Sequence, residues 1–321
     1  MYEAFFGLNQ SPFEISPDPR FLYPTAQHYE ALANLFYAIR RRKGFAVLTG
    51  EVGTGKTLLV RCLLEKLEKQ RVKYSYIFNP SLTPVEFLRY TAADLGVEIN
   101  WKDKSDLLLG LSRFLVRQSQ QGLTAVLVVD EAHLLSCEML EEIRLLNNLE
   151  TSHGKLLQMV LVGQPEMDEK LDSPGLRQLK QRVVFRCQLR PFNVEEVREY
   201  VTWRLKRAGC REAFSLFPED SIEAIYHYSR GFPRLINTIC ENALISAYAA
   251  EAHTISTEMI EEACADLRIF PAAGRPAGAL LPRPADTADL DNEEMLHDPV
   301  VYLEAARKTQ PRRPQHDSED D

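Results

Sequence analysis

The strongest chemical signal in this sequence is a short run that places three glycines ahead of a lysine and a threonine. Glycines at these positions let the backbone curl so that successive N–H groups point inward at phosphate oxygens. The Lys56 ammonium then reaches the outer phosphates, and the Thr57 hydroxyl can ligate Mg²⁺. The spacing therefore predicts a loop that binds a nucleotide triphosphate with its Mg²⁺, made of Gly50, Glu51, Val52, Gly53, Thr54, Gly55, Lys56 and Thr57.

Two adjacent carboxylates follow a second apolar run. Residues 125–129 read Ala-Val-Leu-Val-Val, and Asp130 and Glu131 come directly after them. Because ligands bind beyond the carboxyl ends of parallel strands, both side chains are expected near the phosphate loop. Asp130 would orient the Mg²⁺ shell, and Glu131 would polarise the water that attacks the γ-phosphate. The adjacent pair therefore favours hydrolysis, whereas a single carboxylate would also suit kinases and switches.

Three further polar residues are candidates for the same site. Gln164 follows the apolar run 157–163, where its amide could contact the γ-phosphate or the attacking water; the alternative is a locally bonded turn residue. Arg234 ends a Gly-Phe-Pro-Arg turn that opens a helix, and it could extend over the phosphates; the alternative is a structural salt bridge. His133 follows the carboxylate pair and is expected to be structural rather than catalytic.

Arginines cluster in or just before a fifth apolar run, residues 183–189. They are Arg177, Arg182 and Arg186. An arginine presented at the edge of a domain can stabilise transition-state charge in the site of a neighbouring subunit. Arg182 is the favoured candidate, surface ion pairing is the alternative, and which of the three acts in trans stays open.

Apolar runs alternate with helical patterns up to residue 189, and the pattern is wholly helical from Asn193. Strands are expected at residues 45–49, 72–78, 125–129, 157–162 and 183–189, and helices at 84–95, 104–120, 139–149, 219–229, 234–248 and 257–267. Strands that alternate with helices imply a parallel sheet covered on both faces. The expected fold class is α/β, with a five-stranded parallel P-loop sheet followed by an all-helical lid.

Four segments are expected along the chain. They are a Pro- and aromatic-rich lead-in packed on the nucleotide-binding core, the α/β domain, the helical lid, and a disordered Pro-rich acidic tail: residues 1–26, 27–191, 192–270 and 271–321. Inside the tail, residues 298–307 could form a helix capped by Asp298. This helix is either transient and without a role, or a docking helix for a partner.

The charge is concentrated in the tail. The chain carries a net charge of −8, and residues 271–321 contribute −5 of it, with six Lys or Arg against eleven Asp or Glu. The remainder is nearly neutral and gives no support for nucleic-acid binding. The six cysteines form no CxxC pair, and most fall at apolar positions, so buried free thiols in a reducing cytoplasm are expected. No run approaches the ~18 apolar residues of a membrane span, and the N-terminus is unlike a signal peptide. A cytoplasmic location is therefore expected.

Taken together, these motifs resemble those of the AAA+ ATPases. Residues 50–57 match the Walker A motif and 126–131 the Walker B motif. Gln164 falls at the sensor-1 position, Arg182 at the arginine finger and Arg234 at sensor 2. Gln replaces the commoner Asn or Thr of sensor 1.

Within that superfamily the chain resembles the general-secretion-pathway A ATPases, including variants found at pilus and exosortase loci. The resemblance covers about residues 1–268. It rests on segments at residues 2–8, 12–13, 17–21, 49–57, 163–166 and 179–182. It implies ATP and Mg²⁺ as cofactors, a homo-oligomer, and partners among envelope secretion or export components. Members that act with a secretin usually continue into a transmembrane helix and a periplasmic region, and neither pattern occurs in these 321 residues.

Three functions are compatible with these features. The first is a cytoplasmic ATPase whose oligomer drives assembly of an envelope secretion, pilus or polysaccharide export system. The second is an ATP-dependent DNA-binding regulator resembling the transposition ATPases, for which residues 40–43 form the only supporting basic cluster. The third is a scaffold that binds ATP but barely hydrolyses it.

Overall fold

The protein is described from a computed structural model, which covers residues 1–78, 80–98, 103–152 and 154–271. Apart from Pro271, the expected tail lies outside the described residues, as does its candidate helix at 298–307.

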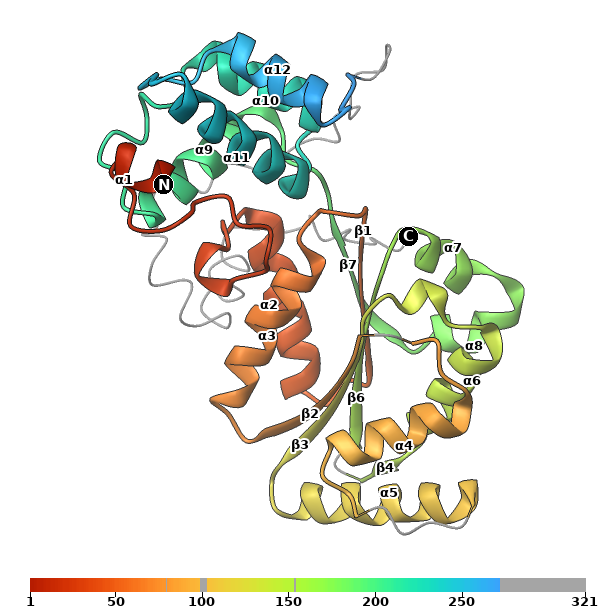
Figure 1. Ribbon diagram of the computed structural model, residues 1–321. Coiled ribbons are helices and arrows are strands. Elements are labelled where there is room, and N and C mark those ends of the chain that lie inside the picture. Colours follow the sequence, from red (N-terminus) through yellow and green to blue (C-terminus); the bar gives the residue numbers. More distant parts are fainter. Residues whose placement is uncertain (79, 99–102, 153, 272–321) are drawn as a thin grey trace, which may run out of the picture.

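Five parallel strands form one sheet in the order β2-β3-β6-β1-β7 (Figure 1). The strands are β1 Phe45–Gly50, β2 Val72–Ile77, β3 Thr124–Val129, β6 Leu157–Gly163 and β7 Val183–Leu189. Strand β6 lies between β1 and β3, and it pairs with both in parallel. This order brings the carboxyl ends of β1, β6 and β3 side by side, at the edge where ligands bind in open α/β sheets. The expected sheet is confirmed.

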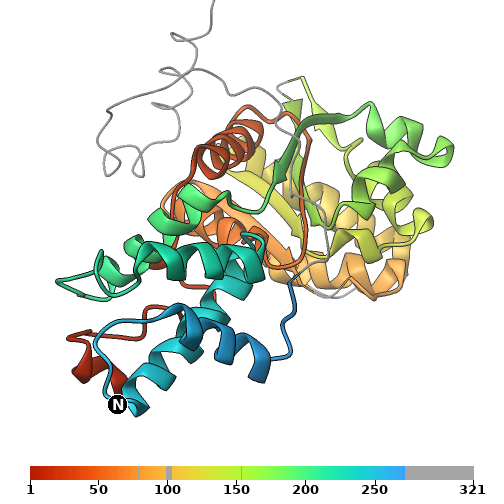
Figure 2. The same ribbon diagram turned by 90° about the horizontal axis from the view of Figure 1, so that it is seen from above.

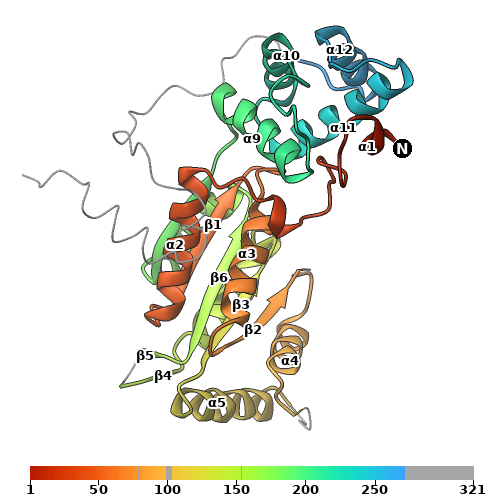
Figure 3. The same ribbon diagram turned by 90° about the vertical axis from the view of Figure 1, so that its left-hand side faces the viewer.

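Helices cover both faces of the sheet because successive side chains of a strand point to opposite sides. Ala46 and Leu48 pack toward one pair of helices, whereas Phe45 and Val47 belong to the core on the other side. The first face is covered by α2 Ala26–Arg40 and α3 Lys56–Glu68, and the second by α4 Pro84–Asp94, α5 Lys104–Gln120, α6 Cys137–Leu146, α7 Glu166–Asp172 and α8 Arg177–Lys180. Figures 1 and 3 show α2 and α3 together on one side of the strands.

The region between β3 and β7 contains short elements that the sequence pattern did not predict. The helix expected at residues 139–149 instead starts at Cys137, where the Ser136 side chain accepts a hydrogen bond from the Met139 backbone N–H at 3.1 Å, and ends at Leu146. The additional elements are the hairpin strands β4 Glu150–Thr151 and β5 Gly154–Lys155, the helices α7 and α8, and the 3-10 turns η2 Ala132–Leu134 and η3 Pro174–Leu176. Most of them are shorter than two helical turns or three strand residues, so no periodicity marks them.

Four helices form a second compact region with its own apolar core (Figure 2). They are α9 Val194–Arg207, α10 Glu219–Ser229, α11 Pro233–Ala249 and α12 Thr257–Asp266. Helix α9 starts with a capping box, in which Asn193 and Glu196 each bond the other's backbone N–H. We call these four helices the lid.

The N-terminal segment packs differently from the expectation. It was expected on the nucleotide-binding core, but helix α1 Tyr2–Phe5 and Phe13 join the core of the lid. The Tyr2 hydroxyl donates to Glu241 of α11 at 2.7 Å. Against α3 of the sheet domain lie the 3-10 turn η1 Pro19–Phe21 and the Pro17 carbonyl, to which Arg61 donates at 2.9 Å. The aromatic residues of this segment therefore complete the apolar core of the lid. That core contains fewer buried apolar residues than the two cores on the faces of the sheet together.

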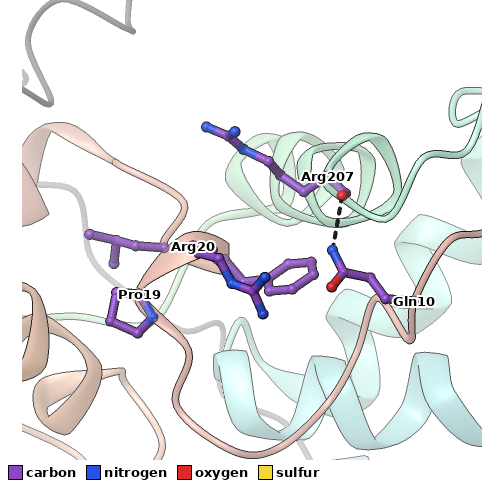
Figure 4. Close-up of a pocket in the computed structure, with 6 residues that line it drawn as sticks. Gln10, Pro19, Arg20 and Arg207 are labelled. Carbon is purple, nitrogen blue, oxygen red and sulfur yellow. Dashed lines mark hydrogen bonds between the residues drawn. The ribbon is translucent and has the colours of Figure 1, made fainter.

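A buried arginine fastens this segment to the lid. Arg204 is 4% exposed, and its guanidinium donates to the carbonyls of Pro12 and Glu14 and to the Tyr200 hydroxyl. Nearby, the Gln10 amide donates to the Arg207 carbonyl at 3.3 Å, beside a shallow pocket that also includes Arg20 (Figure 4). The lining of this pocket contains no residue of the phosphate loop.

A close backbone contact holds Phe192, at the start of the lid segment, against the turn before α11. The Phe192 N–H donates to the Gly231 carbonyl at 2.8 Å. A Cβ atom on Gly231 would lie 1.9 Å from the Phe192 oxygen, and the φ of Gly231 is +76°. Only glycine accommodates this approach and this backbone conformation together. None of the helices in the described ranges is both long and apolar enough to cross a membrane.

Candidate nucleotide site

The phosphate loop connects the end of β1 to the start of α3. Gly53 and Gly55 have φ values of +83° and +95°, in the left-handed region that favours glycine. The Lys56 ammonium donates to the carbonyls of Gly50 at 2.7 Å and Glu51 at 3.0 Å. Burial lowers the pKa of Lys56, and nearby carboxylates, first Glu131, act against that shift. The loop therefore holds its cation over its own carbonyls, at the N-terminus of a helix that favours anions.

Side-chain oxygens from three elements meet beside the loop. The Thr57 hydroxyl donates to Asp130 Oδ2 at 3.2 Å, and the Tyr76 hydroxyl of β2 donates to the same oxygen at 2.8 Å. Asp130 is only 4% exposed. Burial and the Asp130 charge raise the pKa of Tyr76, so its hydroxyl stays a donor. Sequence reasoning missed Tyr76, because only the pairing of β2 with β3 places it beside the carboxylate.

This corner fits a Mg²⁺ ion that is shared with phosphate. No group of three or more His, Cys, Asp or Glu side chains in the described ranges could hold a metal by itself. Mg²⁺ prefers oxygen ligands and commonly takes one carboxylate, waters and substrate phosphates. The Thr57 and Asp130 oxygens supply that partial set, so phosphate oxygens and waters would complete it.

Glu131 occupies an unusual backbone conformation directly after β3. Its φ is +51° and its ψ is +34°, a left-handed geometry that costs a non-glycine residue about 1–2 kcal/mol. Its backbone N–H donates to Asp130 Oδ1 at 2.9 Å. One carboxylate oxygen, Oε2, is buried without a hydrogen-bond partner, and His133 Nδ1 lies 3.5 Å from it. Strain of this kind is typical of sites where side-chain direction matters.

Gln164 reaches His133 across the end of the sheet. Its side-chain amide lies 3.1 Å from His133 Nε2, and its backbone N–H donates to His133 Nδ1 at 3.4 Å. Because β6 lies between β1 and β3, Gln164 stands between the phosphate loop and the carboxylates. We call Asp130, Glu131, His133 and Gln164 the carboxylate edge. Sequence reasoning set His133 aside, but the structure places its ring between two candidate catalytic side chains.

Arg234 brings the lid onto the phosphate loop through its backbone. Its N–H donates to the Gly53 carbonyl at 3.3 Å, and a Cβ on Gly53 would lie 3.0 Å from the Arg234 Cβ. Arg234 is the second residue of α11, after Pro233, which fixes the start of the helix. The structure therefore brings this sequence-predicted residue next to the loop.

The three candidate arginines lie away from the loop of their own chain. Arg182 precedes β7, and its guanidinium donates to the Arg144 carbonyl at 3.1 Å. A seven-residue strand that rises about 3.3 Å per residue separates it from the carboxyl edge of the sheet, so the distance is on the order of 20 Å. Arg186 pairs with Asp172 at 3.2 Å and Asp168 at 3.6 Å, whereas Arg177 is exposed.

A buried histidine lies close to the loop on the α2 side. His28 Nδ1 is 2.6 Å from the Thr25 hydroxyl. A Cβ on Gly55 would lie 3.8 Å from His28 Nε2. Burial lowers the pKa of His28 to about 4, so the ring is neutral near pH 7. No motif in the sequence pointed to His28, because a lone histidine on an amphipathic helix carries no spacing signal.

The basic cluster at residues 40–43 takes part in contacts within the chain. Arg40 donates to the Gln70 side chain at 2.6 Å. Arg42 donates to the Ser119 hydroxyl at 2.8 Å and to the Leu123 carbonyl at 3.1 Å. Arg41 lies over the Tyr37 ring, 5.8 Å from its centroid. Three of the four basic side chains therefore make contacts within the chain.

Comparisons with known proteins show what the chain is similar to. Residues 39–171 match a family model described as an AAA domain. The chain is 44% identical over 256 residues to general secretion pathway protein A of Aeromonas hydrophila. The aligned region covers 79% of this chain and 46% of that protein. The chain thus spans about half the length of this relative.

Solved structures share the fold at low sequence identity. The Aeropyrum pernix ORC2 protein in ADPNP–ADP complexes superposes with a TM-score of 0.60 at 17% identity, over 80% of this chain and 71% of that one. Drosophila ORC bound to DNA gives a TM-score of 0.62 at 18% identity, over 83% and 66%. These similarities establish the fold alone.

Proposed function

We propose that this chain, an AAA-domain protein related to general secretion pathway protein A, binds ATP with Mg²⁺ and hydrolyses the ATP. The observation that carries the proposal is the convergence of Lys56, the Thr57–Asp130 pair and Glu131 at one edge of the sheet. Each is the residue type that its position requires: a cation for phosphates, oxygens for Mg²⁺ and a carboxylate for water.

The residues divide the reaction between them. Bound ATP supplies the γ-phosphate that water attacks and further oxygens for Mg²⁺. The loop N–H groups and Lys56 would hold the phosphates, while Thr57 and Asp130 would bind the metal. Glu131 would accept a proton from the attacking water. Gln164 and Arg234 would contact the γ-phosphate from the sheet and from the lid.

Phosphate release by the purified chain tests this directly. We expect Mg²⁺-dependent release that Glu131→Gln reduces by about 10²- to 10⁴-fold, the usual contribution of a positioned general base. The exposed carboxylate of Glu138 provides the control, since Glu138→Gln should leave the rate unchanged. ATP binding without phosphate release by the unmodified chain would instead support a nucleotide-dependent scaffold.

We further propose that the ATPase acts as a homo-oligomer and drives assembly of an envelope secretion, pilus or polysaccharide export system. The relationship to general secretion pathway protein A supports these partners. The position of Arg182, far from the loop of its own chain, supports a role in the site of a neighbouring subunit. All six cysteines are free thiols, as is usual in a reducing cytoplasm, and we propose that location. Four of them are buried as expected, whereas Cys137 is exposed and Cys210 is half-buried.

The dependence of the rate on protein concentration tests the oligomer. The rate per subunit should rise with concentration, and Arg182→Ala should abolish that rise. Arg113→Ala serves as the control, because Arg113 is an exposed arginine of α5 outside the three candidates. A rate per subunit that does not change with protein concentration and is unaffected by Arg182→Ala would mean that each chain hydrolyses ATP alone.

An ATP-dependent DNA-binding regulator is the second candidate, since Drosophila ORC shares the fold and is bound to DNA. The structural contacts of Arg40, Arg41 and Arg42 weaken it. Salt-sensitive, ATP-dependent retention on DNA would favour this function, and no retention at low salt would remove it.

A further inference from the structure

Two segments of the chain cross between the sheet domain and the lid. One is the connection from β7 to α9, where the Gln27 side chain of α2 donates to the Arg190 carbonyl at 3.1 Å and accepts from the Arg190 N–H at 2.9 Å. The other is residues 14–17 of the N-terminal segment, which we call the strap. Figure 3 shows the N-terminal chain running from α1, beside α11, to the side of α3. The lid is therefore attached to the sheet domain at two places.

An arginine from each region holds one end of the strap. At the lid end, the buried Arg204 guanidinium of α9 donates to the Glu14 carbonyl at 3.2 Å. At the sheet end, the Arg61 guanidinium of α3 donates to the Pro17 carbonyl at 2.9 Å. The two residues between these carbonyls are exposed. Three residue steps of extended chain span about 11 Å at most, so the strap limits how far α3 and α9 can separate.

Both ends of the strap are anchored beyond the two arginines. On the lid side, Phe13 is fully buried, and its ring meets that of Phe217 with centroids 6.0 Å apart. On the sheet side, the Asp18 side chain accepts a hydrogen bond from the Arg20 N–H at 2.9 Å and caps η1, which packs against α3. Movement of the strap along either region would therefore break apolar or hydrogen-bonded contacts.

The strap leads to the helix that carries the phosphate loop. Helix α3 begins at Lys56, and Arg61 lies five residues further along it. The lid itself reaches the loop through the Arg234 N–H, which donates to the Gly53 carbonyl at 3.3 Å. A hydrogen bond of that length is weak, so a lid held by it alone would separate readily from the loop.

We propose that the strap is a tether, which keeps the lid close to α3, holds Arg234 beside the phosphate loop and thereby slows the release of bound nucleotide. The proposal rests on nucleotide binding at the loop, which belongs to the proposed function. The connection at Arg190 acts as one hinge of the lid, and the strap removes motions that a single hinge would leave free. Because the two residues between the arginine contacts are exposed, the length of the strap sets the effect, and their side chains do not.

A longer strap tests this directly. Insertion of Gly-Ser-Gly-Ser between Ile15 and Ser16 should speed the dissociation of a fluorescent ADP analogue by about tenfold, the size of a typical coupling between two parts of a protein. Stopped-flow fluorescence with excess unlabelled ADP measures the rate. The same insertion between Arg211 and Glu212, two exposed residues between α9 and α10, is the control and should leave the rate unchanged. Equal rates for the strap insertion and the unmodified chain would overturn the proposal.

Two substitutions separate the tether from the stability of the fold. Arg61→Gln opens the contact at the sheet end without changing the chain length, and it should speed dissociation by a smaller factor than the insertion. Ile15→Ser keeps the length and should dissociate like the unmodified chain. Chemical denaturation gives the free energy of unfolding of each variant. Dissociation rates that follow the free energy of unfolding, and not the length and attachment of the strap, would contradict the tether.

Distances between spin labels test the tether without nucleotide. The exposed Cys137 of α6 labels the sheet domain, and Glu262→Cys on the exposed face of α12 labels the lid, while Cys210→Ser removes a half-buried thiol that could also react. Double electron–electron resonance should give a broader distance distribution with the strap insertion than without it. Equal distributions would overturn the proposal. If the ADP analogue does not bind, the proposed function fails, and these distances still decide whether the strap restrains the lid.

Discussion

The phosphate loop and the carboxylate edge lie side by side, yet they are built in different ways. The loop is eight consecutive residues, and its geometry comes from backbone: two left-handed glycines and the carbonyls that hold Lys56. The edge takes side chains that follow two strands, β3 and β6, and lie at least 31 residues apart across them, together with Tyr76 from a third strand. Its geometry depends on the order of the strands and on the register of their pairing.

This difference separates what each region can do. Backbone N–H groups at a helix N-terminus form an anion-binding site whose geometry is fixed by the backbone itself. Side chains at a sheet edge can change partners, because each is free to rotate about its own bonds. We therefore expect the loop to determine nucleotide affinity and the edge to determine the rate of hydrolysis.

Removal of the loop cation should have the largest effect. Lys56→Ala should weaken ATP binding and slow phosphate release by about 10²- to 10³-fold, because a buried charged donor to the phosphates is lost. Calorimetric titration with a non-hydrolysable ATP analogue measures the first effect. Lys66→Ala, near the end of the same helix, is the control. Affinity equal to that of the unmodified chain would show that the loop does not bind through Lys56.

A side chain at Gly231 should disrupt the packing of the lid against Phe192. Gly231→Ala places a Cβ 1.9 Å from the Phe192 oxygen at a φ of +76°. We expect a loss of about 3 kcal/mol in the free energy of unfolding. Chemical denaturation measures this loss. Gly175→Ala is the matched control, since a Cβ there meets nothing within 4 Å and its φ is not positive. Equal stability of both variants would contradict the packing described at Phe192.

The pH dependence of stability tests the burial of His28 beside the loop. Its pKa of about 4 lies below the ordinary value of 6.5. Between these pH values the unfolded chain binds the proton and the folded chain does not. The free energy of unfolding therefore decreases progressively as the pH falls from 6.5 to 4. The shift corresponds to about 3 kcal/mol by pH 4.

His28→Gln removes this titration and should flatten the stability profile between pH 6.5 and 4. His253→Gln, an exposed histidine, should leave the slope of the unmodified chain in place. Parallel profiles for His28→Gln and the unmodified chain would show that His28 is accessible to solvent protons.

Loss of the Tyr76 hydroxyl should have the smallest effect. Tyr76→Phe removes one of the donors to Asp130 Oδ2 and leaves Thr57 in place. One hydrogen bond to a charged group is worth about 1.5–3 kcal/mol in a buried site, but Mg²⁺ would replace this one. We therefore expect only a few-fold change in the Mg²⁺ concentration that supports half-maximal ATP binding. A change of about 10²-fold would mean that Tyr76, not the metal, sets the position of Asp130.

The sequence predicts the phosphate loop more fully than the carboxylate edge, because the loop is one continuous segment and the edge combines residues from separate strands. Consecutive residues with fixed types, such as 50–57, are visible as a motif. The ends of the long helices and strands were also predictable from periodicity and from caps such as Asn193 with Glu196. Tyr76 and the contacts of His133 could not be predicted, because they depend on which strands become neighbours and in which register.

The N-terminal segment shows the same limit at the level of packing. Its aromatic residues correctly indicated a packed segment, but nothing in their spacing distinguishes the sheet domain from the lid. The contacts of Tyr2 with Glu241 and of Arg204 with Pro12 join positions more than 190 residues apart. Interactions at that separation follow from tertiary structure and leave no local pattern.

The most direct test of the central claim compares binding and hydrolysis in Glu131→Gln. A single-turnover experiment with Mg²⁺ and ATP measures both the fraction of ATP bound and the rate of phosphate release. We expect binding within a few-fold of the unmodified chain and release slowed by at least about 10²-fold. Loss of binding in proportion to loss of release would contradict the division of work between the phosphate loop and the carboxylate edge.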